Sequence, residues 1–192
     1  MATALSIPLD QVSFISVDVE TTGLDPQKDA IIEIGAVKVR AGQIVEEFDT
    51  LVSIERLIPP DAQRVHHISA DMLTGAPPIA DALPLLWQFA GDGTLVEHSF
   101  RAFDVAFLEH ANGSRLTVPY VNTCTLSRRL FPFHRSHSLD KCCTRFAIVN
   151  TRKHRALSDA RATAQLLIKL LELCRNKYPL LQDLIAVASV ER

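Results

Sequence analysis

The sequence lacks any apolar run close to the roughly 18 residues that a membrane-spanning helix needs. Its first residues, Met1 to Ser6, have neither the basic start nor the long apolar core of a secretory signal. Cysteine is also rare, because the chain has four cysteines and no Cys-x-x-Cys spacing. These features argue against a disulfide-stabilised domain and predict a cytoplasmic protein with reduced thiols and no membrane segment.

Internal repeats, low-complexity runs and linkers are missing as well, and the expected loops are short. What is present is a chain of 192 residues with 47% hydrophobic residues and a mean hydropathy of +0.13. A chain of this size can bury one hydrophobic core. We therefore expect a single domain over 1–192, with its core over about 12–175 and a C-terminal helical tail over 176–192.

Charge is close to balanced over the whole chain but unevenly distributed along it. The net charge of −2 does not by itself indicate a polyanion binder. Residues 128–161, however, hold nine Lys and Arg residues against the two acids Asp140 and Asp159, a net +7, and the rest of the chain is −9. Such a basic segment fits local phosphate binding beside an acidic site. A solvated helical face would give the same pattern, so both interpretations stay open.

The hydrophobic periodicity changes along the chain. Apolar, β-branched stretches predict three successive strands, most simply an antiparallel meander, after which helical spacing alternates with short strands. We expect an α/β domain, with a mixed five-stranded sheet flanked by helices. The expected strands are 14–20, 30–40, 44–53, 94–96 and 118–124, and the expected helices are 61–65, 69–73, 78–90, 103–112, 126–130, 138–146, 158–178 and 180–190, with Asp61, Ser69, Ser138 and Ser158 as helix caps.

The first predicted strand ends in two acidic residues, within the stretch Phe14 to Gly23 that reads F-I-S-V-D-V-E-T-T-G. Side chains two positions apart in a strand point to the same face, so Asp18 and Glu20 are expected side by side. Adjacent carboxylates repel each other, and a hard divalent cation removes that cost because it prefers oxygen ligands. Taken alone, however, the pair also fits the solvated end of a strand.

Three later residues bear on this choice. Asp104 lies where a helix is expected to begin after the 94–96 strand, and Asp159 lies in the first turn of the long helix. His154 lies in the loop before that helix, five residues ahead of Asp159. Taken singly, each acid is typical of a helix N-terminus and the histidine of a surface loop.

Together, these residues form three motifs in a fixed order. Asp18-x-Glu20-Thr-Thr-Gly follows a strand, Phe-Asp-x-x-Phe-Leu occupies 103–108, and His154-x4-Asp159-Ala160 precedes a long helix. In this combination the chain resembles the DEDDh (DnaQ-like) family of 3′→5′ exonucleases, and within it the branch that proofreads for bacterial DNA polymerase III. The resemblance runs from about Phe14 to Leu173.

The resemblance implies a ribonuclease H-like fold and the release of nucleoside 5′-monophosphates from the 3′ ends of single-stranded or frayed DNA. Two Mg²⁺ or Mn²⁺ ions would stabilise the attacking and leaving oxygens, held by Asp18, Glu20, Asp104 and Asp159. His154 would be the general base that takes a proton from the attacking water, a role that suits histidine because its ordinary pKa is about 6.5. These five residues are the expected catalytic set.

The resemblance also indicates which residues meet the substrate. The turn after the first motif would contact the terminal nucleotide through Thr21, Thr22, Gly23 and Leu24. Val65-His66-His67-Ile68 matches the family's Val-His-Gly-Ile, so His66 is expected at the substrate, with His67 in place of glycine. His98 would correspond to the histidine of the family's His-Asn-Ala-x-Phe-Asp, but here one extra residue separates it from Asp104.

Other functions stay open at this point. An RNase T-like enzyme that trims RNA 3′ ends fits the first motif equally well, and a non-catalytic module that docks on nucleic acid or a polymerase is a third reading. The expected partners are DNA or RNA 3′ ends and a DNA polymerase or another replication or repair subunit. His134, His137, Cys142 and Cys143 are candidate zinc ligands, although vicinal cysteines seldom both reach one metal.

Overall fold

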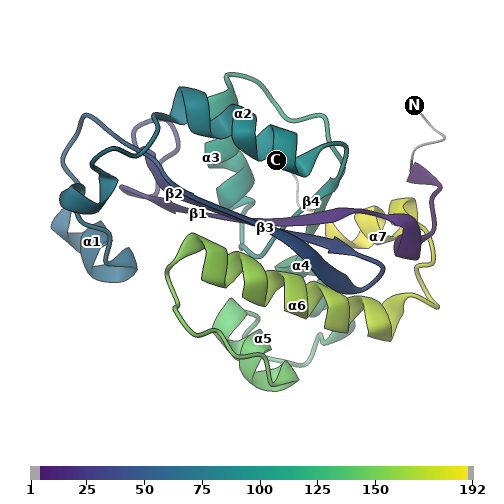
Figure 1. Ribbon diagram of the computed structural model, residues 1–192. Helices are drawn as coiled ribbons and strands as arrows, with labels where there is room; N and C mark the ends of the chain where they lie inside the picture. The colour runs from purple at the N-terminus through teal and green to yellow at the C-terminus, as the bar shows by residue number, and fades with distance from the viewer. Residues whose placement is uncertain (1–4, 190–192) are drawn as a thin grey trace.

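The computed structural model describes residues 5–189, which form a five-stranded sheet with helices on both faces (Figure 1). The strand order is β3-β2-β1-β4-β5, so β1 is central. β2 is antiparallel to β1 and β3, whereas β4 and β5 run parallel to β1. The predicted mixed sheet and opening meander are confirmed. The strands are β1 Phe14–Thr21, β2 Ile31–Arg40, β3 Gln43–Leu51, β4 Thr94–Glu97 and β5 Tyr120–Asn122.

Helices cover the sheet in layers. α2 and α3 lie on one face, α4, α6 and α7 on the other with α5 packed outside α6, and α1 lies beyond one end of the sheet (Figure 1). The helices are α1 Pro60–His66, α2 Ile79–Ala90, α3 Phe103–Asn112, α4 Thr123–Leu130, α5 Leu139–Phe146, α6 Ala156–Cys174 and α7 Leu181–Ala188, with 3-10 turns at Leu9–Gln11 and Ala70–Leu73.

The alternation of β1 decides which core each side chain joins. Ile15, Val17 and Val19 pack into the core under α2 and α3. Phe14 packs into the core under α6, and on the same face the hydroxyl of Ser16 donates a 2.8 Å hydrogen bond to the carbonyl of Ala160 in α6. Asp18 and Glu20 continue this second series, so the strand itself directs both carboxylates toward α6.

Two expected helix caps are wrong. α6 begins at Ala156 with Arg155 at the N-cap, so Ser158 lies inside the first turn and its hydroxyl bonds to the loop before the helix. α1 begins at Pro60, because the fixed φ of proline suits the first turn of a helix, and Asp61 is therefore a helical residue. Ser138 does occupy the N-cap of α5, but its side chain makes no cap hydrogen bond.

The last strand is shorter than expected. β5 spans only Tyr120–Asn122, and α4 begins at once with Thr123. The reason is the Asn122 side chain, which accepts a 3.0 Å hydrogen bond from the N–H of Thr125 and so caps α4. The predicted helix at 126–130 is therefore the second half of a longer one.

The expected C-terminal helix forms as α7, from Leu181 to Ala188, and the expected end of that helix at Val190 lies outside the described residues. The segment before α7 pairs with the first described residues, through a bridge between Pro8 and Leu180 and a 3.0 Å bond from the N–H of Leu181 to the carbonyl of Ile7. None of the helices within residues 5–189 has the length and apolar character needed to cross a membrane.

Candidate active site

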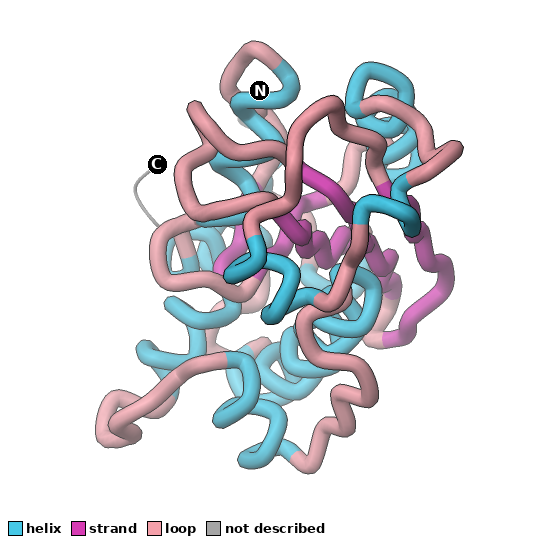
Figure 2. Tube along the Cα trace, turned by 90° about the vertical axis from the view of Figure 1, so that its left-hand side faces the viewer, coloured by secondary structure: helices cyan, strands magenta, loops and turns pink. Residues whose placement is uncertain are grey.

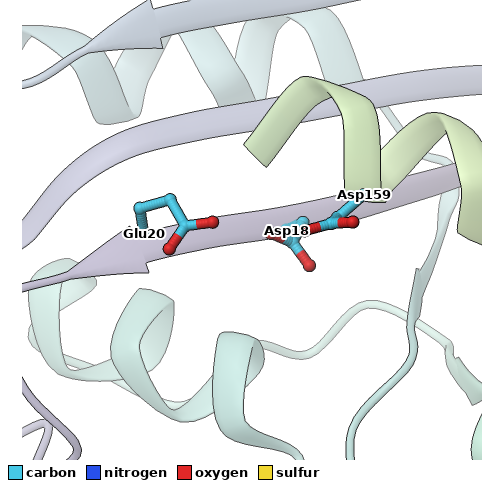
Figure 3. A group of neighbouring side chains, drawn as sticks. All are labelled: Asp18, Glu20 and Asp159. Carbon is cyan, nitrogen blue, oxygen red and sulfur yellow. The ribbon is translucent and has the colours of Figure 1, made fainter. Parts of the chain in front are cut away.

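Three carboxylates meet where the central strand approaches the start of α6. Asp18 and Glu20 come from β1 and Asp159 from the first turn of α6, and one ligand oxygen of each lies within 4.8 Å of those of the other two (Figure 3). In Figure 3 the carboxylates of Asp18 and Asp159 lie next to each other, with Glu20 farther along the strand. This geometry brings together three of the four predicted metal ligands.

Asp104 lies beside this group without being part of it. The parallel pairing of β1 with β4 ends at Ser16, so the next part of β1 has a free edge on that side. Asp104, in the first turn of α3, accepts a 3.1 Å hydrogen bond from the N–H of Val19 at this edge. The carboxylate thereby replaces the missing strand partner and is held next to Asp18.

The carboxylates raise each other's pKa. Burial raises the pKa of Asp18 well above its ordinary value, and the charges of Asp104 and Asp159 raise it further. Burial and the nearby Asp159 raise the pKa of Glu20 from 4.5 to about 8. Burial also raises the pKa of Asp159, and burial together with Glu97 raises that of Asp104. A set of oxygen ligands that repel one another fits a divalent cation, because the cation removes the repulsion.

α6 can approach the carboxylate pair because β2 has a glycine there. Gly35 lies opposite Asp18 in the sheet, and a Cβ on Gly35 would lie 2.1 Å from the backbone nitrogen of Leu157. Any side chain at this position would push the start of α6, with Asp159, away from β1. Sequence reasoning missed this residue, since a glycine inside a strand is only a general sign of close approach.

A buried ion pair fixes the same end of α6. Glu33 of β2 is 1% exposed and accepts two hydrogen bonds from the Nε of Arg155, at 3.0 and 3.1 Å. It also accepts a 2.9 Å bond from the N–H of Ala156, so this side chain of β2 caps α6. The signal in the sequence was an acid within the apolar run of 31–39, a position where a charge needs a partner.

His154 lies in the loop that this ion pair anchors. Its backbone is left-handed, with φ 59°, its side chain is exposed, and its N–H donates a 2.8 Å bond to Oδ2 of Asp159. The side chain of Asn150 donates to the other oxygen, Oδ1, and accepts a 2.7 Å bond from the hydroxyl of Ser158. The loop is therefore folded onto Asp159, with the His154 imidazole facing solvent beside the carboxylates.

The turn after β1 forms a cavity with α1. Thr21, Thr22, Gly23 and Leu24 line a space of about 510 Å³ together with His66 and Phe103, and Glu20 lies at its edge. Gly23 has no room for a side chain, because a Cβ would lie 2.4 Å from the carboxylate of Asp29. Leu24 is 84% exposed at this cavity. Five of the six predicted substrate-binding residues are thus neighbours. They belong to α1 and to the turn after β1, at the end of the sheet where α1 lies in Figure 1, and Figure 2 shows the molecule from that side.

His66 has an unsatisfied polar atom in this cavity. The ring is buried, and its Nδ1 accepts a 2.9 Å hydrogen bond from the N–H of Ile68. Burial lowers the pKa of His66, so the neutral ring carries its proton on Nε2. That Nε2 has no partner among the described residues. A buried donor without a partner is costly, which marks Nε2 of His66 as a candidate contact for a ligand in the cavity.

His98, the sixth predicted substrate-binding residue, lies elsewhere. Between His98 and Asp104 the backbone turns left-handed at Ala102, with φ 54°. The His98 ring faces α4, with Nδ1 2.8 Å from the Thr123 hydroxyl and Nε2 2.8 Å from the His137 carbonyl. Burial lowers the pKa of His98 to about 4. The candidate zinc ligand His137 is similarly engaged, through the Ser127 hydroxyl at 2.8 Å and the His134 carbonyl at 3.2 Å.

Comparison with known proteins gives this site a family. The model of the RNase_T exonuclease family matches residues 15–167, which include all the carboxylates described above. The chain belongs to this family. It is 35% identical over 170 residues to the DNA polymerase III subunit epsilon of Aquifex aeolicus, covering 86% of this chain and 84% of that protein. The predicted class, a DEDDh-type 3′→5′ exonuclease, is confirmed.

Larger relatives and solved structures agree. The DNA polymerase III PolC-type protein of Thermotoga maritima is 39% identical over 168 residues, which are 85% of this chain and 12% of that protein. The chain thus spans about an eighth of the length of the PolC-type relatives it matches. Exonuclease X, solved with 5′ overhanging duplex DNA, is 30% identical with a TM-score of 0.71, covering 83% of this chain and 92% of that one. The ribonuclease H-like fold is confirmed.

Proposed function

We propose that this family member removes nucleoside 5′-monophosphates one at a time from the 3′ ends of single-stranded or frayed DNA. The observation that carries the proposal is the position of a carboxylate cluster at the edge of a cavity with a buried, unpartnered donor. Asp18, Glu20 and Asp159 form the cluster, and His66 supplies the donor. A terminal nucleoside in the cavity would place its 5′ phosphate next to the carboxylates.

Two Mg²⁺ or Mn²⁺ ions are the proposed cofactors, held by Asp18, Glu20, Asp104 and Asp159. When bound, such ions stabilise the charge on the attacking and leaving oxygens of an in-line displacement at phosphorus. The donor set supports this choice, because all four groups are carboxylates, which hard cations prefer. Asp104 lies outside the group of three, and the N–H of Val19 holds it at the neighbouring edge of β1.

His154 is the proposed general base. Its loop is pinned to Asp159 through the backbone, so the imidazole is free to turn without breaking a side-chain hydrogen bond to Asp159. The ring would take the proton of the attacking water when the substrate phosphate is in place. Asn150 and the Glu33–Arg155 pair do not react in this scheme, and they hold the loop and the start of α6 in position.

The cavity lined by Thr21–Leu24 is the proposed seat of the terminal nucleoside. The neutral His66 would donate from Nε2 to a substrate oxygen. Leu24 would pack against the terminal base, which agrees with its high exposure at the cavity. A duplex end would have to fray before the base could enter, so single strands are the expected preferred substrate.

The proposal is tested with a 5′-labelled DNA oligonucleotide and the purified chain. With Mg²⁺ or Mn²⁺ we expect a ladder of products shortened from the 3′ end, and no shortening in chelator or in the Asp18→Asn variant. Asp92→Asn, an exposed acid in the turn before β4, is the matched control and should retain full activity. An intact oligonucleotide at every metal concentration would refute the proposal and favour a binding module.

A parallel digestion of matched RNA decides the sugar preference. DNA is the proposed substrate because Exonuclease X, 30% identical to this chain, was solved with DNA. Faster digestion of RNA would instead make the chain an RNA-trimming enzyme. We further propose a DNA polymerase as partner and the cytoplasm as location, on the strength of the epsilon and PolC-type relatives. Co-purification with a bacterial replicative polymerase tests this association.

A further inference from the structure

A second cavity, larger than the proposed nucleoside site, lies on the other side of the loop that follows β4. Its volume is about 780 Å³, within the range of ligand sites. It is lined by the loop residues 98–100, by Cys124 and Arg128 of α4, and by 132 and 134–139 ahead of α5. No step of the proposed reaction uses it.

The lining of this cavity is basic and aromatic. Arg128 and Arg135 line it, and none of the lining side chains that the structure describes is acidic. The guanidinium carbon of Arg128 lies 4.4 Å from the ring centroid of Phe100, and that of Arg101 lies 5.8 Å from it. Phe100 is nevertheless 63% exposed, so ring surface remains for a ligand. Cations beside an exposed aromatic ring are the chemistry that receives single-stranded nucleic acid.

The arginines at this cavity are not neutralised by the protein. Within the basic segment 128–161, Lys153 pairs with Asp140, Arg155 with Glu33 and Arg161 with Glu47. No carboxylate among residues 5–189 forms an ion pair with Arg128 or Arg135. The wall of the cavity therefore carries part of the positive charge of this segment that no ion pair compensates.

One short loop connects this cavity with the carboxylates. His98, Ser99 and Phe100 line the cavity, and Phe103 lines the proposed nucleoside site. The loop is braced internally, since the Ser99 hydroxyl accepts a 2.9 Å bond from the N–H of Phe103. Phe100 and Asp104 are four positions apart in the chain, so their Cα atoms are at most about 14 Å apart. At the 3.4 Å rise of a duplex strand, that distance is about four nucleotides, and fewer in an extended strand.

We propose that this cavity, the Phe100–Arg128 cavity, holds the DNA strand a few nucleotides upstream of the phosphate that is cut. Phe100 stacks on a base, and Arg128 and Arg135 pair with phosphates. The inference rests on the proposed function, because it assumes that the 3′ end occupies the cavity lined by Thr21–Leu24. It adds a specificity determinant that distinguishes a long strand from a mononucleotide.

The test compares a substrate that fills only the carboxylate site with one that reaches the second cavity. The short substrate is the p-nitrophenyl ester of thymidine 5′-monophosphate, and the long one is an octathymidylate. For Phe100→Ala, we expect the ratio of kcat/KM on the octamer to kcat/KM on the ester to fall roughly 5- to 150-fold, the effect of losing one stacked base. Arg129→Gln, an exposed arginine of α4 outside the cavity, should leave this ratio unchanged.

Binding without turnover separates this inference from the proposed function. In chelator, the affinity of the chain for labelled octathymidylate is measured against salt concentration. For Arg128→Gln, the slope of log K against log salt should become shallower by about 0.7, the value for one lost phosphate contact on a single strand. If the chain hydrolyses neither substrate but these binding differences persist, the proposed function fails and the strand site stands. Equal losses on ester and octamer, or no loss on either, would overturn the strand site.

Discussion

At the scale of single residues, the site contains groups with a proposed chemical role and groups that hold them in place. His154 is exposed and, within residues 5–189, hydrogen-bonded only through its backbone, whereas Asp159 is held at both oxygens. The imidazole of the proposed base should therefore contribute little to stability, while the polar groups around it should contribute much. Substituting the imidazole should lower activity with little effect on stability, whereas substituting the polar groups around it should lower stability.

For His154→Gln we expect kcat to fall by about 10²- to 10⁴-fold, the usual contribution of a general base. KM and the midpoint of thermal unfolding should change little, because the side chain is exposed. His110→Gln, at the exposed end of α3, serves as the control. Steady-state kinetics at saturating Mg²⁺ measure the effect, and a loss below tenfold would exclude His154 as the base.

Glu20 should give the metal-free protein a characteristic pH dependence. Its pKa is about 8 in the folded protein against an ordinary 4.5, so the folded state binds the proton more tightly than the unfolded state. The contribution of Glu20 to the free energy of unfolding is therefore fully present below pH 4.5 and is lost as the pH rises toward 8. Unfolding by urea in chelator between pH 5 and 8.5 measures the decline.

Two variants sharpen this measurement. Glu20→Gln should reduce the decline without abolishing it, because the amide does not titrate while Asp18, Asp104 and Asp159 also have raised pKa values. Saturating Mg²⁺ should flatten it in the wild-type chain as well, since a cation compensates the charges. A wild-type stability that rises with pH over this window in chelator would contradict the assignment.

At the scale of elements, the contact between β2 and the start of α6 organises the site. Two ion pairs join the sheet to α6, and they differ in burial. Glu33 and Arg155 are 1% and 21% exposed at their side chains, whereas Glu47 and Arg161 are 35% and 38% exposed. The pairs therefore offer an internal comparison within one interface.

Glu33→Gln should destabilise the protein by about 3–5 kcal/mol, because it leaves a charge without its buried partner and weakens the cap of α6. Glu47→Gln, which breaks the more exposed pair, should cost less than about 1 kcal/mol. Urea unfolding at pH 7 in Mg²⁺ compares them. Similar small costs for both variants would mean that Arg155 finds another partner.

Gly35→Ala tests the close approach of α6 to β2. The added Cβ would overlap the backbone of Leu157, so we expect a loss of about 3 kcal/mol and a marked loss of activity. Gly42→Ala in the β2–β3 turn has open space around its Cβ but a φ of +74°, and it should cost about 1 kcal/mol without loss of activity. Unfolding and nuclease assays on both variants check this contrast.

The elements also show how much of the fold and the site could be predicted from the sequence. Periodicity predicted the sheet, and the order of the motifs predicted which acids converge. The sequence pattern could not place the start of α6, because the cap comes from Glu33, more than a hundred residues away. Gly35 and Asn150 were missed for the same reason, since each acts through a contact that only the folded chain creates.

At the scale of the whole molecule, acidic and basic side chains gather at two different sites. The acids of the candidate site come from β1, α3 and α6, and the unpaired arginines of the second cavity come from α4 and the loop after it. The sequence indicated a basic segment but could not say which of its cations were paired. His98 illustrates a related limit, because its ring bonds to Thr123 of α4 and to the carbonyl of His137, contacts that the spacing of the motif could not reveal.

The pairing of Ile7 and Pro8 with Leu180 and Leu181 has a consequence for the order of the chain. In Figure 1 it joins the first described residues to the start of α7, at the opposite end of the sheet from α1. α7 is eight residues long, about 12 Å, so a short Gly-Ser linker can join its end to residue 5. A circular permutant opened between Gly113 and Ser114, after the end of α3, should therefore fold and keep nuclease activity.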